Sequence, residues 1–248
     1  MVAPRRLGLI LAAALAGVVS IPAAGGAPRS RPIVWVQAGH EFPREPGYRA
    51  QTGAAGEVQF NVRVATALER RLRAAGVDAR HSPGEVADFP SNGAVFVSIH
   101  YDTPNGHAAV GHAISGAGEN WYRGEGFGLP RSTPYPDSAR HRGPATTVSA
   151  AVEARSGRLA SLLRNRYAAV FTRAKGARSG AVGLEPRSGN LRMMRYVGYY
   201  RTRADARVLI ECGAGGTDAA MLRRTDIVAN AISGAIVAYL RTEGRLPR

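Results

Sequence analysis

The stretch Ala94-Val95-Phe96-Val97-Ser98-Ile99-His100 decides the fold class of this chain. It is apolar at nearly every position before its final histidine, which is typical of a strand buried on both faces of a sheet. Residues 33–36 have the same character and lead to His40, and residues 207–210 lead directly to Glu211. Short apolar runs of this kind, rich in valine and isoleucine, predict three buried strands.

Between these runs, three longer segments have the spacing of amphipathic helices. Apolar residues recur in them every three or four positions, which places those residues on one face of a helix. In the first segment, which ends before Gly76, they are Val58, Val62, Ala65, Leu68 and Leu72. In the second, which ends before Gly176, they are Leu159, Leu162, Leu163, Tyr167 and Val170. The third is the closing helix over 227–240, and Thr217 and Asp218 can cap a short helix before it.

Further strands are predicted over 77–80 and 191–196. Strands that alternate with helices predict an α/β domain with a mostly parallel twisted sheet flanked by helices. We expect this single domain to span residues 28–248. In open sheets of this kind the active site lies beyond the carboxyl ends of the strands, so one cleft can collect the residues that follow the three buried strands.

Residues 103–150 interrupt the alternation of predicted strands and helices. They are rich in glycine and proline and include Trp121, Tyr122 and Phe127. We interpret them as a long loop-rich insertion. Loops of this length without regular structure are usually functional lids or disordered segments, so a lid over the substrate and a mobile surface insertion both remain open.

The first residues form a secretory signal pattern. Arg5 and Arg6 precede the apolar run 7–21, which ends in small residues. A membrane span needs roughly 20 apolar residues, and this run is interrupted by Gly17. We therefore predict a signal peptide over 1–27 and no transmembrane domain after its cleavage, with an uncleaved anchor as the alternative. Either way, the protein is expected to be exported to the periplasm, the cell wall or the extracellular space.

Charge and cysteine content restrict the partners and the kinds of site. The formal net charge is +15, which favours a polyanionic partner, and nucleic acid, anionic lipid and anionic wall polymers all fit this charge. Export argues against nucleic acid, and the chain has no zinc-finger spacing. Cys212 is the single cysteine, so an intrachain disulfide and a paired-cysteine metal site are both excluded. We expect Cys212 to pack as a small apolar residue rather than to act as a nucleophile.

His40, Glu57 and His100 are the candidate metal ligands. A catalytic zinc takes three protein ligands from His and carboxylate and keeps a fourth position open. The two histidines follow buried strands, and Glu57 lies in the first turn of the helix after the His40 loop. Either histidine alone would also fit a hydrogen-bonded structural residue. Glu41, next to His40, is a rival third ligand.

Glu211 is the candidate catalytic residue. The strand before it delivers it into a glycine-rich turn, residues 213–216. A carboxylate at this edge of the sheet can approach water at the metal without binding the metal, and can act as a general base. Amide hydrolysis is the chemistry that this set of residues predicts. A salt bridge or a helix cap is the structural alternative for Glu211.

Together these residues form a pattern that resembles the zinc-dependent N-acetylmuramoyl-L-alanine amidases of bacterial cell walls. The matching segments, in the family's order, are Ala38-Gly39-His40, Gly56-Glu57, Val97-Ser98-Ile99-His100-Tyr101-Asp102 and Val208-Leu209-Ile210-Glu211-Cys212-Gly213, with support from 156–160 and 218–222. The resemblance covers the chain from about residue 32 to its end. It implies zinc at His40, Glu57 and His100, catalysis by Glu211, and hydrolysis of the bond between N-acetylmuramic acid and L-alanine in peptidoglycan.

The chain departs from the family pattern at three places. Glu41 stands where the family usually has a glycine after the first histidine, the segment before the second histidine is short, and the insertion over 103–150 is long. Two alternatives therefore stay open: a non-catalytic or regulatory wall-binding protein that keeps the fold, and a metallopeptidase that cuts peptide bonds alone.

Overall fold

The structure is a computed structural model that describes residues 30–41, 53–83, 92–104, 106–113, 148–175, 183–186 and 202–248. The elements below all belong to the unit Arg31–Arg248. The predicted signal peptide, the predicted strand over 191–196 and residues 114–147 of the predicted insertion lie outside the described residues. For those segments the sequence-based expectations stay predictions.

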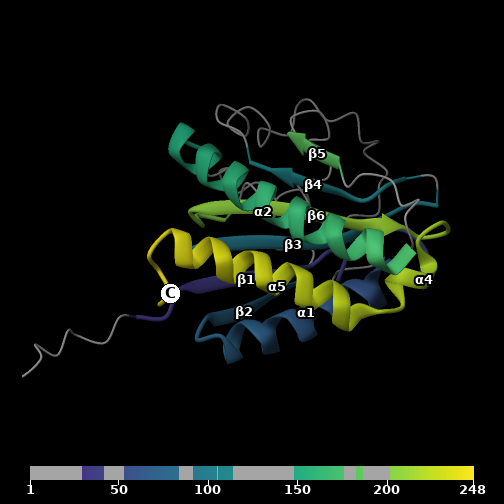
Figure 1. The fold of residues 1–248 in the computed structure, drawn as a ribbon, viewed down its shortest axis with the longest axis horizontal. Helices are drawn as coiled ribbons and strands as arrows, with labels where there is room; N and C mark the ends of the chain where they lie inside the picture. Colours follow the sequence, from purple (N-terminus) through teal and green to yellow (C-terminus); the bar gives the residue numbers. More distant parts are fainter. Residues whose placement is uncertain are drawn as a thin grey trace, which may run out of the picture. The chain divides into compact units, whose positions relative to one another are not determined.

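The described residues form one six-stranded sheet (Figure 1). Its strands are β1 (Ile33–Ala38), β2 (Asp78–Pro83), β3 (Val95–Asp102), β4 (Ala109–His112), β5 (Gly183–Pro186) and β6 (Ala206–Ala214), in the spatial order β2-β1-β3-β6-β4-β5. The neighbours are parallel except for β4 and β6, which run antiparallel. The predicted α/β class and the mostly parallel sheet are therefore confirmed.

Helices α1 (Glu57–Ala74), α2 (Ala150–Lys175), α4 (Ala219–Leu222) and α5 (Thr225–Thr242) complete the described fold. Helix α1 packs on β1, β2 and β3, α2 packs on β4 and β6, and α5 lies between α1 and α2. The turn after α1 is the one predicted, because Gly76 has a φ of 83°, a left-handed conformation that glycine adopts at little cost. None of the helices in this part of the chain has the length and apolarity needed to cross a bilayer.

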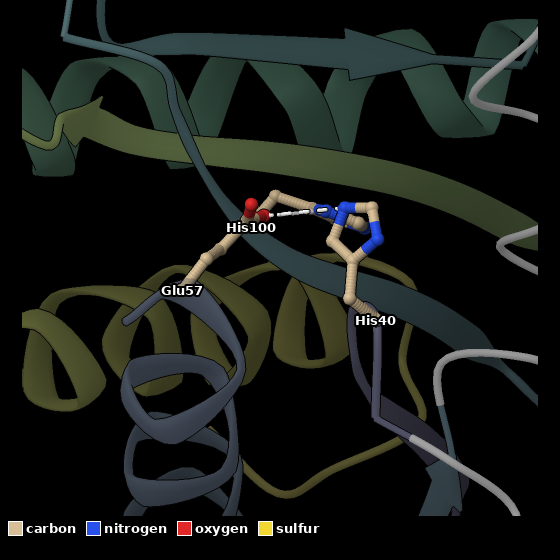
Figure 2. Close-up of side chains that lie close together, drawn as sticks. All are labelled: His40, Glu57 and His100. Carbon is tan, nitrogen blue, oxygen red and sulfur yellow. Dashed lines mark hydrogen bonds and ion pairs between the residues drawn. The ribbon is translucent and has the colours of Figure 1, made fainter. Parts of the chain in front are cut away.

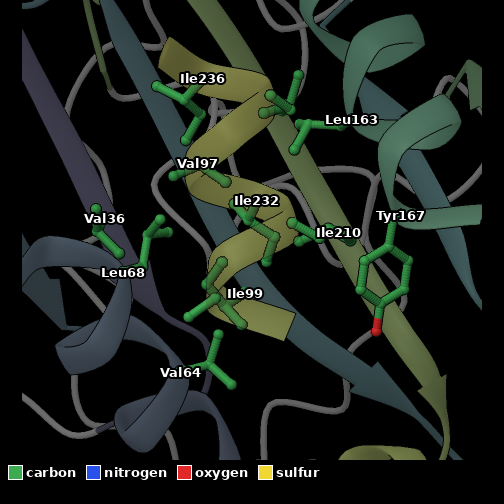
Figure 3. Packing of buried hydrophobic residues seen from close by; sticks show 14 of the residues in the cluster. Val36, Val64, Leu68, Val97, Ile99, Leu163, Tyr167, Ile210, Ile232 and Ile236 are labelled. Carbon is green, nitrogen blue, oxygen red and sulfur yellow. The ribbon is translucent and has the colours of Figure 1, made fainter. Parts of the chain in front are cut away.

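The two faces of the central strands differ in chemistry. Val97, Ile99 and Ile210 point toward the helices and pack with Leu68 of α1 and Ile232 of α5 in the hydrophobic core (Figure 3). Side chains alternate between the faces of a strand, so the intervening positions face the other way. Those positions hold buried polar groups: Gln37, Ser98, His100 and Glu211. The central strands therefore separate an apolar core from a polar layer.

Two strands were missed by the sequence analysis. Strand β4 lies inside the segment 103–150, so the expectation that this whole segment lacks regular structure is wrong at 109–112. Each missed strand has only four residues, AVGH in β4 and GLEP in β5. Their glycine and proline residues are typical of turns, and only pairing within the sheet makes them strands.

A buried leucine provides a test of the core. Leu68 is fully buried between α1 and the sheet. We expect Leu68→Ala to lower the free energy of unfolding by about 2–5 kcal/mol, because it removes buried methyl groups and leaves a cavity. Urea denaturation followed by circular dichroism would measure the loss. The exposed Arg70 of the same helix gives the control Arg70→Ala, and an equal loss in both variants would contradict this account of the core.

An ion-pair network ties β2 to α1 and to the residue after the β1 turn. His81 Nδ1 lies 2.6 Å from Glu69 Oε1, and His81 Nε2 lies 2.6 Å from Glu41 Oε2. Glu69 also accepts a hydrogen bond of 2.8 Å from Arg73. The hydrogen bonds with Glu41 and then Glu69 raise the pKa of His81 to about 9. At neutral pH an imidazolium therefore donates to both carboxylates.

This network predicts a pH-dependent contribution to stability. Because the folded-state pKa of His81 lies above its ordinary value of 6.5, the stabilisation is fully present below about pH 6.5 and is lost as the pH rises through about 9. We expect the difference in unfolding free energy between wild type and His81→Gln to shrink across this range. His107→Gln, at an exposed histidine, controls for histidine replacement. A difference that stays constant or grows with pH would contradict the assignment.

Candidate metal centre

Three side chains from separate parts of the chain converge at the carboxyl edge of the sheet. His40 follows β1, Glu57 opens α1, and His100 lies near the end of β3 (Figure 2). Each offers one ligand atom, and these atoms all lie within 4.8 Å of one another. The structure thus brings together the three residues that the sequence analysis selected as ligands.

Glu57 Oε1 lies at the centre of this group. It is 3.1 Å from His100 Nδ1 and 3.4 Å from His40 Nε2. The two imidazole rings are almost perpendicular, at 85°, with their centroids 4.9 Å apart. Two nitrogens and one carboxylate oxygen therefore face a common point, which is the donor set that zinc prefers in catalytic sites.

The backbone at Gly39 and His40 brings the first histidine into place. Gly39 N donates a hydrogen bond of 2.9 Å to Ile99 O, and a Cβ on Gly39 would lie only 2.2 Å from the His100 ring. Any larger residue would therefore displace a ligand. His40 has a φ of 60°, in the left-handed region that few non-glycine residues adopt.

Glu57 is positioned by the start of α1. Its Oε2 accepts a hydrogen bond of 2.7 Å from the Ala54 amide, and its Oε1 lies 3.3 Å from the Tyr101 amide. Tyr101 in turn donates a hydrogen bond from its hydroxyl to Ala55 O. These contacts hold a carboxylate that is only 2% exposed, and they join the N-terminal turn of α1 to β3.

Asn61 is a residue of the site that the sequence analysis missed. It is fully buried, and its Nδ2 lies 2.8 Å from Gly39 O and 3.4 Å from Glu57 Oε1. Residues four apart lie on the same face of a helix, so Asn61 follows Glu57 toward the site. A buried amide on the apolar face of an amphipathic helix was the signal that could have identified it.

The electrostatics suit a cation. Burial, and then the nearby His100, lower the pKa of His40 to about 4, so the His40 ring is uncharged at neutral pH, the form in which an imidazole can bind a metal. Burial alone would raise the pKa of Glu57, but the hydrogen bond with His100, the charges of the two histidines and the Ala54 amide outweigh it and lower that pKa. Glu57 therefore offers an anionic oxygen, and the three residues could together hold a divalent metal ion.

Glu41, the rival third ligand, lies outside this group. Its carboxylate pairs with His81 at 2.6 Å, and the described metal-ligating group contains Glu57 instead. Adjacency to His40 in sequence does not bring Glu41 into this group, because residue 41 follows a left-handed residue and its carboxylate reaches His81 of β2.

Glu211 lies beside His100 on the neighbouring strand. The two residues are register partners in the parallel pair β3 and β6, so their side chains lie on the same face of the sheet. Glu211 is 2% exposed. Beyond it the register shifts, and Asp218 Oδ2 accepts a hydrogen bond of 2.7 Å from the Ala214 amide in the following turn. Irregularities of this kind are frequent next to active sites.

Cys212 lies on the opposite face, within the core, as expected. Burial, and then the charge of Glu211, raise the pKa of its thiol well above its ordinary value. A thiol in this environment stays protonated and is a poor nucleophile. Tyr167 donates a hydrogen bond of 2.6 Å to the Cys212 carbonyl oxygen, which fixes the backbone next to Glu211.

Comparison with known proteins gives the fold a family context. No family model matches the sequence, and no curated protein matches it either. Among solved structures, it is similar to the N-acetylmuramyl-L-alanine amidase Ami1 from Mycobacterium smegmatis, with a TM-score of 0.53, 18% identity, and coverage of 86% of this chain and 99% of that one. The CwlD amidase from Clostridioides difficile, solved in complex with the GerS lipoprotein, matches with a TM-score of 0.51, 15% identity, and coverage of 86% and 100%.

An N-acetylmuramoyl-L-alanine amidase from Clostridium difficile 630 matches with a TM-score of 0.50 and 16% identity, over 87% of this chain and 100% of that one. These structural matches span nearly the whole length of the amidases. The resemblance inferred from the sequence is therefore confirmed in three dimensions: this chain has the fold of the N-acetylmuramoyl-L-alanine amidases.

Proposed function

We propose that this protein is an exported zinc-dependent amidase that hydrolyses the bond between N-acetylmuramic acid and L-alanine in peptidoglycan. The observation that carries the proposal is the convergence of His40, Glu57 and His100 within 4.8 Å at the carboxyl edge of a sheet with the amidase fold. Sites of open α/β sheets lie at this edge. The fold and the donor set point to the same chemistry.

In this proposal, His40 Nε2, Glu57 Oε1 and His100 Nδ1 hold the zinc ion. When bound, zinc acts as a Lewis acid that polarises the scissile carbonyl and makes water more acidic. The chain's own contribution is to hold these three atoms in fixed positions. The Ala54 amide and Asn61 orient the carboxylate, and the close approach of Gly39 to His100 limits the space around the rings.

Glu211 is proposed as the general base and then the general acid. Glu211 is the register partner of His100 in the β3–β6 pair. This supports the role, because its carboxylate lies on the same face of the sheet as the His100 ring. It would take a proton from water as the water attacks the carbonyl, and would deliver a proton to the leaving amine of L-alanine. Burial at 2% exposure limits competition from bulk solvent.

The remaining proposals concern the substrate and the location. Residues 1–27 are proposed to be a signal peptide and residues 28–248 the catalytic domain, with 103–150 as an insertion. The basic composition, with a formal net charge of +15 for the full sequence including Arg5 and Arg6, would favour adsorption to peptidoglycan and anionic wall polymers.

The role of Glu211 is tested with Glu211→Gln. We expect the release of peptide from purified peptidoglycan to fall by at least about 100-fold, the scale of a lost general base, with zinc content unchanged. Mass spectrometry of the digested muropeptides would measure release and identify the bond that is cut. The control is Glu243→Gln at the C-cap of α5, where the carboxylate pairs with Arg158. Retained release by Glu211→Gln would contradict the assignment.

The metal site is tested with Glu57→Gln and by chelation. We expect Glu57→Gln to lose most of its zinc, because it removes the one anionic ligand. Chelation of the wild type should abolish peptide release, and added zinc should restore it. Elemental analysis of the dialysed protein would measure the metal. Wall binding without any new amino termini in digested wall would favour the non-catalytic alternative, and cleavage of peptide bonds alone would favour a metallopeptidase.

A further inference from the structure

A line of three buried polar residues leads away from the proposed metal site. Ser98 Oγ lies 3.0 Å from His100 Nε2 and donates a hydrogen bond of 2.7 Å to Gln37 Oε1. All three side chains are fully buried. Ser98 precedes His100 by two positions on β3, and Gln37 is the register partner of Ser98 on β1, so the three lie on one face of the sheet.

The hydroxyl of Ser98 has a single proton, and this proton is donated to Gln37. Ser98 Oγ can therefore only accept from His100 Nε2, which must carry a proton. Nδ1 then faces Glu57 Oε1, 3.1 Å away, in a hydrogen bond whose proton a metal bound at Nδ1 would replace. A reversed Gln37 amide would make Ser98 donate to Nε2, so that Nε2 would carry no proton and Nδ1 would keep the proton that it shares with Glu57 Oε1.

We propose that Ser98 and Gln37 are positioning residues that select Nδ1 of His100 as its metal-coordinating nitrogen. This inference rests on the proposed metal site and specifies how one of its ligands is prepared. Metal-bound histidines commonly donate their other N–H to an outer partner, which fixes the tautomer and the ring orientation. Here the partner is the Ser98 hydroxyl, which donates its own proton to the amide oxygen of Gln37 on β1.

The direct test is the identity of the coordinating nitrogen. The full chain would be labelled with ¹⁵N-histidine and loaded with zinc chloride, and long-range ¹H–¹⁵N NMR would assign each ring, with His100→Gln to identify the His100 signals. We expect His100 to bind zinc through Nδ1 and to keep a proton on Nε2. Coordination through Nε2 would overturn the proposal, and this measurement needs no variant of Ser98 or Gln37.

Two variants test the relay, which is the pair of hydrogen bonds that joins Gln37, Ser98 and His100. Ser98→Ala removes the acceptor, and Gln37→Leu frees the hydroxyl to donate to Nε2. We expect each to weaken zinc binding by about tenfold or more in competition with a chelator, and to populate the Nε2-bound or mixed form in the NMR spectrum. Ser98→Thr keeps a hydroxyl and should keep Nδ1 coordination. Ser233→Ala is the matched control, because this buried serine bonds only to Asn230 O in α5 among the contacts of the described residues.

The outcomes separate this inference from the proposed function. Zinc binding by the wild type that Ser98→Ala and Gln37→Leu leave unchanged would overturn the relay alone. Weaker binding with unchanged Nδ1 coordination would assign Ser98 a purely structural role and would also overturn it. A wild type that binds no zinc would overturn the proposed function and the relay together.

Discussion

The contact between Glu57 Oε1 and His100 Nδ1, at 3.1 Å, is the constraint on which the site depends. Both groups are buried, and a buried charge is costly unless it is paired and hydrogen-bonded. The Ala54 and Tyr101 amides and the Asn61 side chain supply the remaining hydrogen bonds to the carboxylate. On the other side of the ring, Ser98 Oγ lies 3.0 Å from His100 Nε2 and is itself held by its hydrogen bond to Gln37. Glu57 and His100, two of the three candidate ligands, are therefore each oriented by neighbouring groups of the fold.

The separation of apolar and polar faces allows these polar side chains to be buried without interrupting the hydrophobic core. Helices α1, α2 and α5 contribute to one hydrophobic core with one face of the central strands, and the polar layer is built on the alternate positions of the same strands. Burial of the apolar face stabilises the register of β1, β3 and β6, because a slip of one residue would exchange the faces. That register in turn sets Gln37 beside Ser98 and Glu211 beside His100. His40, with its left-handed backbone, follows β1 at the edge of this polar layer.

Residue 41 shows how a departure from the family pattern is accommodated. Where the resembling family usually has glycine, this chain has a glutamate whose carboxylate pairs with His81. His81 also pairs with Glu69 of α1. The residue that follows His40 is thereby anchored to β2 and α1 without entering the ligand group.

The sequence by itself determined the α/β class, the long helices and the residues at the ends of the buried strands. These features follow from local hydrophobic periodicity and chain order, which are properties of short segments. Only the tertiary structure decided that β4 and β5 are strands, since four residues with glycine or proline become a strand through pairing alone. It also placed Glu57, and not Glu41, beside the two histidines, and it revealed Asn61, Ser98 and Gln37 around these candidate ligands. Those roles depend on register and side-chain direction, which arise when distant segments pack together.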